Sequence, residues 1–159
     1  MINIKKLLNY DPFEWKIKSS AGVIIILKGD KFLLCHPTGH KWVDSYSFPK
    51  GGIEKDETKI EAAIRELREE TSLIINESMI ENINNPIIID YKNKRGFNYK
   101  KVYLFIVRIN EISEVGLENE TLDRSLLQLE EVDWCGFLSK SEANIRIFKR
   151  FSPLLNLLN

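Results

Sequence analysis

Apolar and polar positions alternate along the chain in blocks that predict a mixed fold of strands and helices. Two apolar runs, "AGVIIIL" and "KFLLCH", flank Gly29 and Asp30 and predict a β-hairpin whose first strand is buried on both faces. A short strand is expected to end at Phe48 and Pro49, just before two glycines. The runs "PIIIDY", "KKVYLFIVRI" and "LEEVDWCGFL" predict further strands, the first two joined by a basic connection with Gly96 near its tip.

A helical period follows the glycines. Thr58 and Glu61 have the spacing of a capping box, which satisfies the free amide groups at a helix start, so we expect a helix from Thr58 to about Thr71. The apolar positions at three- and four-residue spacing predict a buried stripe of Ile60, Ile64, Leu67 and Thr71. Near the C-terminus, Ser141 and Ser152 are expected to cap two closing helices. The side chains expected to face the core there are Phe148, Phe151, Leu154, Leu155 and Leu158.

The length of 159 residues fits one domain with a core large enough to be stable without added cross-links. The 23 basic residues balance the 23 acidic ones, which argues against a surface devoted to nucleic acid or anionic lipid. Cys35 and Cys135 lie far apart without metal-ligand spacing, so we interpret them as small buried residues in a reducing cytoplasm. No apolar stretch has the length of a signal peptide or a membrane span, so we expect a soluble protein.

The predicted helix carries three carboxylates, Glu66, Glu69 and Glu70, that become neighbours at this spacing. Like charges so close repel one another, so the pattern indicates a bound cation. Magnesium prefers oxygen ligands and commonly joins a few carboxylates to substrate phosphates. A metal-activated water can then attack phosphorus. An acid-rich helix is more often a solvated face, so the cluster alone does not decide between the two interpretations.

The segment from Gly51 to Leu73 has a more specific pattern. With one exception, at Ser72, it follows the pattern glycine, five residues, Glu, seven residues, Arg-Glu, an aliphatic residue, any residue, Glu-Glu, any residue, glycine and an aliphatic residue. This pattern resembles the Nudix box, the signature of the Nudix hydrolases, and so many fixed positions are far more specific than a lone glycine-rich fingerprint. The matching residues are Gly51, Glu57, Arg65, Glu66, Leu67, Glu69, Glu70 and Leu73.

The resemblance implies a Nudix fold of the α/β (α+β) class, a mixed β-sheet between α-helices, over residues 20–159. Residues 1–19 stay outside it as an N-terminal extension. The resemblance also implies that divalent ions, magnesium or alternatively manganese, bind at the Gly51 carbonyl and at Glu66, Glu69 and Glu70, with Glu70 and Glu66 as the foremost ligands. It further implies that Arg65 pairs with Glu57 to fix the loop against the helix. The implied catalytic residues are Glu57, Arg65, Glu66, Glu69 and Glu70.

Two positions depart from the family's pattern. Ser72 replaces the box glycine where helices often end in a left-handed residue, a conformation that costs a non-glycine residue about 1 to 2 kcal/mol, so it bears on stability more than on chemistry. Many Nudix enzymes place a further glutamate six residues before a tryptophan, as metal ligand or general base; counted back from Trp134, that position is Gln128. The substitutes we consider, each of which is otherwise an ordinary surface acid, are Glu120, Glu130 and Glu131.

Other residues are candidates for holding the substrate. Lys50, directly before the glycines, is placed to meet a phosphate, although an ordinary turn lysine explains it too. The basic connection can hold the far end of a polyphosphate or an RNA 5′ end, but a solubilising hairpin tip gives the same pattern. Its basic residues are Lys92, Lys94, Arg95, Lys100 and Lys101. The aromatic candidates for stacking on a base, most of which would otherwise be core, are Tyr91, Phe97, Tyr99 and Trp42. His36 and His40 lack metal-ligand spacing and are left out of the site.

The resemblance therefore implies a metal-dependent pyrophosphohydrolase that cleaves a phosphoanhydride bond in a nucleoside diphosphate linked to another group. The segments "FPKGGIEKDE" and "VDWCGFLSKSEA" are most similar to dinucleoside polyphosphate hydrolases and RNA 5′ pyrophosphohydrolases. ADP-ribose or another nucleoside diphosphate sugar is the next candidate substrate. A Nudix-fold module that senses a nucleotide without cleaving it is the main competitor from another class, although it is expected to lose box glutamates, all of which are present. A further alternative is a structural or interaction domain in which the acid cluster has no function.

Overall fold

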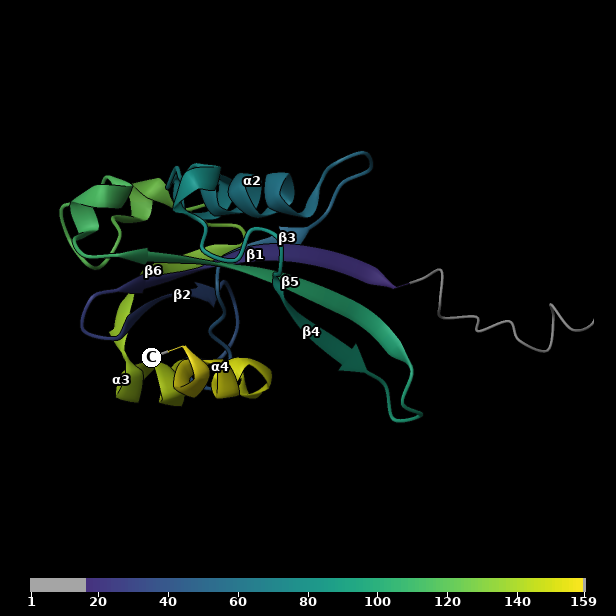
Figure 1. The fold of residues 1–159 in the computed structure, drawn as a ribbon. Coiled ribbons are helices and arrows are strands. Elements are labelled where there is room, and N and C mark those ends of the chain that lie inside the picture. Colours follow the sequence, from purple (N-terminus) through teal and green to yellow (C-terminus); the bar gives the residue numbers. More distant parts are fainter. Residues whose placement is uncertain (1–16, 159) are drawn as a thin grey trace, which may run out of the picture.

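The computed structural model describes residues 17–158, which form a six-stranded mixed sheet between helices (Figure 1). The strand order is β4-β5-β1-β2-β6, and the short β3 pairs with β1. β1 and β5 run parallel, and the other pairs are antiparallel. The predicted fold class is confirmed. The strands are β1 (Lys18–Leu27), β2 (Lys31–Pro37), β3 (Lys50–Gly52), β4 (Ile87–Lys92), β5 (Asn98–Ile109) and β6 (Val132–Ser139).

Helices cover both faces of the sheet. Helix α2 (Lys59–Thr71) lies on one face, and α3 (Lys140–Arg146) and α4 (Ser152–Leu157) lie on the other (Figure 1). Each face has its own core: Ala63 and Leu67 of α2 pack in one cluster, and Leu155 of α4 and Phe151 pack in the second. No helix in the described residues is both long and apolar enough to cross a membrane.

The predicted hairpin is confirmed as β1 and β2, which meet at the register pair Leu27 and Lys31. Gly29 and Asp30 turn the chain with φ values of 94° and 62°, a conformation that glycine and aspartate tolerate well. β1 is buried on both faces as expected, because it lies between β5 and β2 with helices above and below. Cys35 and Cys135 are buried free cysteines, as the sequence predicts, and the Cys35 Sγ donates a hydrogen bond to the Cys135 Sγ at 3.2 Å.

The short strand before α2 lies later than predicted. The strand was expected to end at Phe48 and Pro49, whereas β3 begins at Lys50 and runs through both glycines. Proline has no amide hydrogen to donate, so Pro49 contributes only its carbonyl, which accepts from Val23 at 3.1 Å. Phe48 is 1% exposed and packs in the core. β3 therefore brings the glycines themselves against the sheet edge beside α2.

Helix α2 has the predicted boundaries. The Thr58 side chain accepts from Glu61 N while the Glu61 side chain accepts from Thr58 N, each at 3.1 Å, so the capping box is complete. The buried stripe is present, although Ile60 and Ile64 are only partly buried. Ser72 ends the helix with φ 64°, the left-handed conformation expected where the box has glycine.

The closing helices differ from the prediction at their caps. Ser139, not Ser141, caps α3, because its hydroxyl accepts from Glu142 N at 3.3 Å. Ser152 is the first residue of α4 rather than its cap, since the 3₁₀ turn Lys149–Phe151 leads directly into that helix. Phe148, expected in the core, is 36% exposed.

The remaining connections are irregular and contain 3₁₀ turns at Glu77–Met79, Ile112–Val115 and Arg124–Leu126. β1 begins at Lys18, so it includes the last two residues of the segment 1–19 that the sequence analysis sets apart. Residues 1–16, and with them any predicted N-terminal element, lie outside the described residues.

Candidate active site

β3 and α2 touch where a glycine meets a glutamate. A Cβ atom at Gly51 would lie 2.1 Å from Cδ of Glu66 and 2.2 Å from its Oε2, so the approach requires the absence of a side chain. A Cβ atom at Gly52 meets nothing within 4 Å. The two adjacent glycines thus differ in role, and only Gly51 lets the backbone of β3 lie against a carboxylate.

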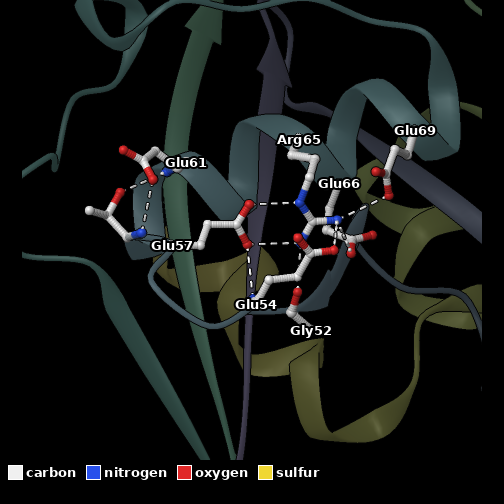
Figure 2. Close-up of polar contacts among 8 residues, drawn as sticks. Gly52, Glu54, Glu57, Glu61, Arg65, Glu66 and Glu69 are labelled. Carbon is white, nitrogen blue, oxygen red and sulfur yellow. Dashed lines mark hydrogen bonds and ion pairs between the residues drawn. The ribbon is translucent and has the colours of Figure 1, made fainter.

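Arg65 ties the preceding loop to α2 (Figure 2). Its Nε donates to Glu57 Oε2 at 2.7 Å and its Nη2 donates to Glu57 Oε1 at 2.9 Å, a two-point contact that matches the planar guanidinium. Nη2 also donates to the carbonyl of Gly52 at 2.8 Å. The hydrogen bond from Arg65 is the main cause that lowers the pKa of Glu57. The pair that the resemblance implies is therefore present in the geometry.

The same arginine binds two of the box acids. Nη1 donates to Glu66 Oε1 at 2.9 Å and to Glu69 Oε2 at 3.0 Å, and both contacts are drawn in Figure 2. Glu70 instead lies near Lys50, whose amide donates to Glu70 Oε2 at 3.3 Å. Arg65 therefore holds part of the acid cluster in place and neutralises part of its charge.

All three acids line one cavity of about 250 Å³ between β3, α2 and the segment before β6. Burial, followed by the negative charge of Glu66, raises the pKa of Glu70 to about 8. Burial also raises the pKa of Glu66. Neighbouring carboxylates that resist ionisation indicate a site short of positive charge. The residues that line the cavity are Lys50, Gly51, Gly52, Glu66, Glu69, Glu70, Gln128 and Glu131.

This set of donors fits a hard divalent ion, because it offers carboxylate and carbonyl oxygens around a polar cavity. Within residues 17–158, however, no three His, Cys, Asp or Glu side chains are already arranged as a metal site. The reason is visible in the geometry, since Glu66 and Glu69 are turned to Arg65. Arg65 contacts only one oxygen of each of these carboxylates, Glu66 Oε1 and Glu69 Oε2, so the second oxygen of each can bind an ion while Arg65 holds the side chain.

The candidates for an additional acid separate clearly. Gln128 and Glu131 line the acidic cavity, because Gln128 N donates to the Glu70 carbonyl at 3.1 Å and Glu131 N donates to the Gln128 carbonyl at 2.9 Å. Glu131 also contributes to the raised pKa of Glu70. Glu120 pairs with Lys31 at 2.6 Å, and Glu130 is exposed without lining this cavity. The turn at Gln128 thus presents an acid three residues later than the family spacing.

A second cavity, of about 460 Å³, adjoins the first through Lys50. Burial, followed by the charge of Lys100, lowers the pKa of Lys50 to about 8. In the described part of the chain, the Lys50 ammonium makes no ion pair within 4.0 Å. The lining residues are Pro37, His40, Lys41, Asp44, Ser45, Ser47, Lys50, Tyr91, Phe148 and Phe151.

The predicted substrate-binding residues lie in different places. Lys50 lines both cavities, but Trp42, Arg95 and Tyr99 line neither. Tyr99 is 41% exposed and packs edge-on against Tyr91. Arg95 is exposed in the turn, where its amide donates to Asn93 Oδ1.

Sequence reasoning missed Phe148 and Phe151 as cavity walls. Both belong to an apolar segment that reads as core, and only the packing of that segment under Tyr91 and Lys50 places them at the cavity. The order "RFSP" carries no signal of its own for a binding site.

A model of the NUDIX domain matches residues 16–151 of this chain. The chain belongs to the Nudix hydrolase family. The Nudix box lies within the match and supplies β3, the loop and α2 of the site.

Individual Nudix proteins are similar over shorter stretches or at lower identity. An RNA pyrophosphohydrolase from Hahella chejuensis is 49% identical over 47 residues, which are 26% of this chain and 29% of that protein. The C. elegans Ap4A hydrolase in a binary complex is 23% identical, with a TM-score of 0.56 over 88% of this chain and 93% of that one. A MutT NUDIX hydrolase from Burkholderia pseudomallei is 12% identical, with a TM-score of 0.64 over 89% and 98%. At these identities the solved structures support the Nudix fold.

Proposed function

We propose that this Nudix protein is a metal-dependent pyrophosphohydrolase that cleaves a phosphoanhydride bond in a nucleoside polyphosphate. The observation that carries the proposal is the adjacency of two cavities of opposite character, one acidic and one lined by aromatic and basic groups, which share Lys50. A polyphosphate joined to a nucleoside has the same two-part chemistry. Its phosphates need cations, and its base needs a flat apolar surface.

In this proposal, the acidic cavity binds the reacting diphosphate through divalent ions. Glu66, Glu69 and Glu70, with the Gly51 carbonyl, would hold magnesium or manganese, and the ion would supply charge neutralisation and an activated water. Arg65 keeps the acids in place through its contacts with Glu66 and Glu69. Its two-point pair with Glu57 fixes the loop that positions β3 against α2. Such supporting contacts typically change metal affinity or activity 10- to 100-fold when they are lost.

Two side chains are candidates for the remaining roles, one as the additional acid and one as the cation that binds the substrate phosphate. Glu131 faces the acidic cavity near Glu70 and is our candidate for the additional acid, in the role that a glutamate at position 128 fills elsewhere in the family. Lys50 has no ion-pair partner of its own within 4.0 Å among the described residues, so a substrate phosphate is its natural partner.

The nucleoside end is assigned to the second cavity. Tyr91 and Phe151 offer aromatic surface there, and their ring centroids lie 6.3 Å apart. Arg150 adds a guanidinium 4.1 Å from the Tyr91 ring centroid, which reinforces a cationic and aromatic wall. The volume of about 460 Å³ lies within the usual range for small-molecule sites.

We rank dinucleoside polyphosphates and RNA 5′ ends first among substrates. The names of similar proteins support this order, since one is an RNA pyrophosphohydrolase and another is an Ap4A hydrolase. ADP-ribose and related nucleoside diphosphate sugars come next, since the NUDIX domain of Shewanella oneidensis NrtR was crystallised with ADP ribose. A cytoplasmic location is part of the proposal and follows from the sequence argument alone.

The test is a substrate panel with magnesium or manganese that contains diadenosine polyphosphates, 5′-triphosphate RNA, ADP-ribose and nucleoside triphosphates. Chromatography follows the products of phosphoanhydride cleavage, which are two nucleotides, pyrophosphate with a 5′-monophosphate end, AMP with ribose phosphate, and a nucleoside monophosphate with pyrophosphate, respectively. We expect turnover of a diadenosine polyphosphate or of 5′-triphosphate RNA, and no turnover without a divalent ion. Turnover of ADP-ribose alone would support the proposed hydrolase activity but contradict the proposed order of substrates. Tight nucleotide binding without turnover of any compound would contradict the enzyme and favour a sensor.

A further inference from the structure

The irregular segment between β2 and β3 forms one wall of the nucleoside cavity. Trp42 and Val43 in this segment are 50% and 47% exposed, and Gly39 and Asp44 have φ values of 83° and 51°. The residues of the segment that line the cavity are His40, Lys41, Asp44, Ser45 and Ser47. Its first part, residues 38–45, is not part of any strand of the sheet, so its shape depends on individual contacts.

One buried side chain makes several of these contacts. His36, at the end of β2, is 1% exposed, and its ring stacks flat on Trp42 with 3.6 Å between centroids and 6° between planes. Its Nε2 lies 3.0 Å from the carbonyl oxygens of both His40 and Lys41. On the other side of the ring, Nδ1 lies 2.5 Å from Oδ1 of Asp133 on β6.

Within residues 17–158, every polar partner of this ring is an acceptor. Carbonyl oxygens cannot donate, and an ionised aspartate cannot donate either. A neutral imidazole has one N–H group and one bare nitrogen, so one of its two nitrogens would face an oxygen without a hydrogen between them. The imidazolium form donates from both nitrogens and satisfies all three partners. A cation stacked on an indole face gains further stabilisation.

The other charged side chains around the His36 ring have partners of their own rather than the ring. Arg146 Nη1 donates to the Trp42 carbonyl at 2.7 Å, and its guanidinium lies 5.9 Å from the Tyr46 ring. Arg124 Nη1 donates to the Asp133 carbonyl at 3.2 Å. Lys41 pairs with Asp44 within the segment at 3.6 Å. Among the described side chains, the carboxylate of Asp133 is therefore the charge that contacts the His36 ring directly.

We propose that His36 is a positioning residue that, as an imidazolium ion, holds residues 38–45 in the shape that forms the wall of the nucleoside cavity. A ring nitrogen without hydrogen would face an oxygen in a buried place, which is unfavourable, so the geometry favours the form that donates from both nitrogens. The occupant of the cavity rests on the proposed function, whereas the charge of His36 and its hold on the segment do not.

The protonation state can be read directly by NMR. The chain has two histidines, so ¹⁵N-histidine labelling of tag-free protein gives two rings, and the variant His40→Gln identifies the signal of His36. We expect both ring nitrogens of His36 to carry hydrogen at neutral pH. A ring nitrogen of His36 without hydrogen at neutral pH overturns the proposal.

The functional consequence is measured with His36→Gln, which cannot donate in both directions along the ring axis. For the positioning role we expect KM, or nucleotide Kd if the panel shows binding without turnover, to rise about 5- to 10-fold while kcat changes less than about 2-fold. The matched control is Lys28→Gln, an exposed residue beyond the end of β1 and outside both cavities. An unchanged KM and Kd in a folded His36→Gln protein contradicts the role. If that variant fails to fold, the NMR result on the native ring decides. Absence of hydrolysis in the native protein contradicts the proposed function without affecting the NMR result.

Discussion

Gly51 of β3 lies against Glu66 of α2 so closely that a Cβ atom at residue 51 would be 2.1 Å from the Glu66 carboxyl carbon. This contact joins the two elements of the Nudix box at the acidic cavity. A side chain at residue 51 must displace either β3 or the carboxylate. The position of Glu66 in the cavity therefore depends on the absence of a side chain at Gly51.

Gly51→Ala is expected to displace Glu66 and lower the affinity for a divalent ion about 10- to 100-fold. Gly52→Ala is the matched control, because a Cβ atom there meets nothing within 4 Å and the carbonyl that binds Arg65 is retained. Titration calorimetry with manganese compares the two. Equal affinities in both variants would mean that the close approach has no part in metal binding.

Glu57→Gln is expected to lower the free energy of unfolding by about 1 to 3 kcal/mol at neutral pH, because it removes the charge that Arg65 contacts at two points. The pKa of Glu57 is lower in the folded protein than in the unfolded chain, so its contribution is present above the unfolded pKa and is lost as the pH falls through the folded pKa. Urea denaturation at several pH values checks this.

The urea series has a control in Glu54→Gln, whose carboxylate is 70% exposed and 3.9 Å from Arg65. We expect it to change stability by less than about 0.5 kcal/mol. The difference in unfolding free energy between native protein and Glu57→Gln should shrink at acid pH. A difference that stays the same there would mean that it does not come from the charge of Glu57.

Two substitutions at Ser72 distinguish the effect of backbone strain from the effect of a local hydrogen bond. Its hydroxyl donates to the Leu126 carbonyl at 2.6 Å while its backbone holds a φ of 64°. Ser72→Ala keeps the strain and loses the bond, so it should destabilise by about 1 kcal/mol. Ser72→Gly also loses the bond but relieves about 1 kcal/mol or more of strain, so thermal unfolding should rank Gly above Ala and near the native protein. The reverse order would refute this account of the box departure.

Lys50→Met should lower kcat/KM at least about 10-fold on any substrate that the panel identifies, because a buried ammonium near Glu70 then no longer meets the phosphate. Lys55→Met, at an exposed lysine of the loop before α2, is the control and should match the native rate. Steady-state kinetics on both variants measures the difference. A native-like kcat/KM for Lys50→Met would show that this lysine does not bind the substrate phosphate.

Local sequence signals predicted the elements that make the acidic cavity. The capping box defined the start of α2 at Thr58, and the glycine turn defined the β1–β2 hairpin, because both depend on a few neighbouring residues. The pairing of Arg65 with Glu57 was expected from the box and is present in the geometry. The start of β3 was misplaced, since pairing of Lys50 with Gly22 is decided by another strand.

The second cavity could not be predicted in the same way. Lys50 and Phe151 meet only because the C-terminal segment packs under the sheet, so no spacing in the sequence connects them. Glu131 reaches the acidic cavity through a turn whose amide bonds to Glu70, which a count from Trp134 cannot reveal. His36 was set aside because histidines without metal spacing are usually incidental, yet its ring contacts the segment that walls the cavity.

The central claim is that the acids of α2 bind a divalent ion together. The most direct measurement is an EPR titration of manganese into the native protein and into Glu70→Gln, with the exposed Glu130→Gln as control. The account predicts saturable binding to the native protein and to Glu130→Gln, and binding weakened by about 10-fold or more in a folded Glu70→Gln protein. No saturable binding to the native protein, or equal binding to all three, would contradict it.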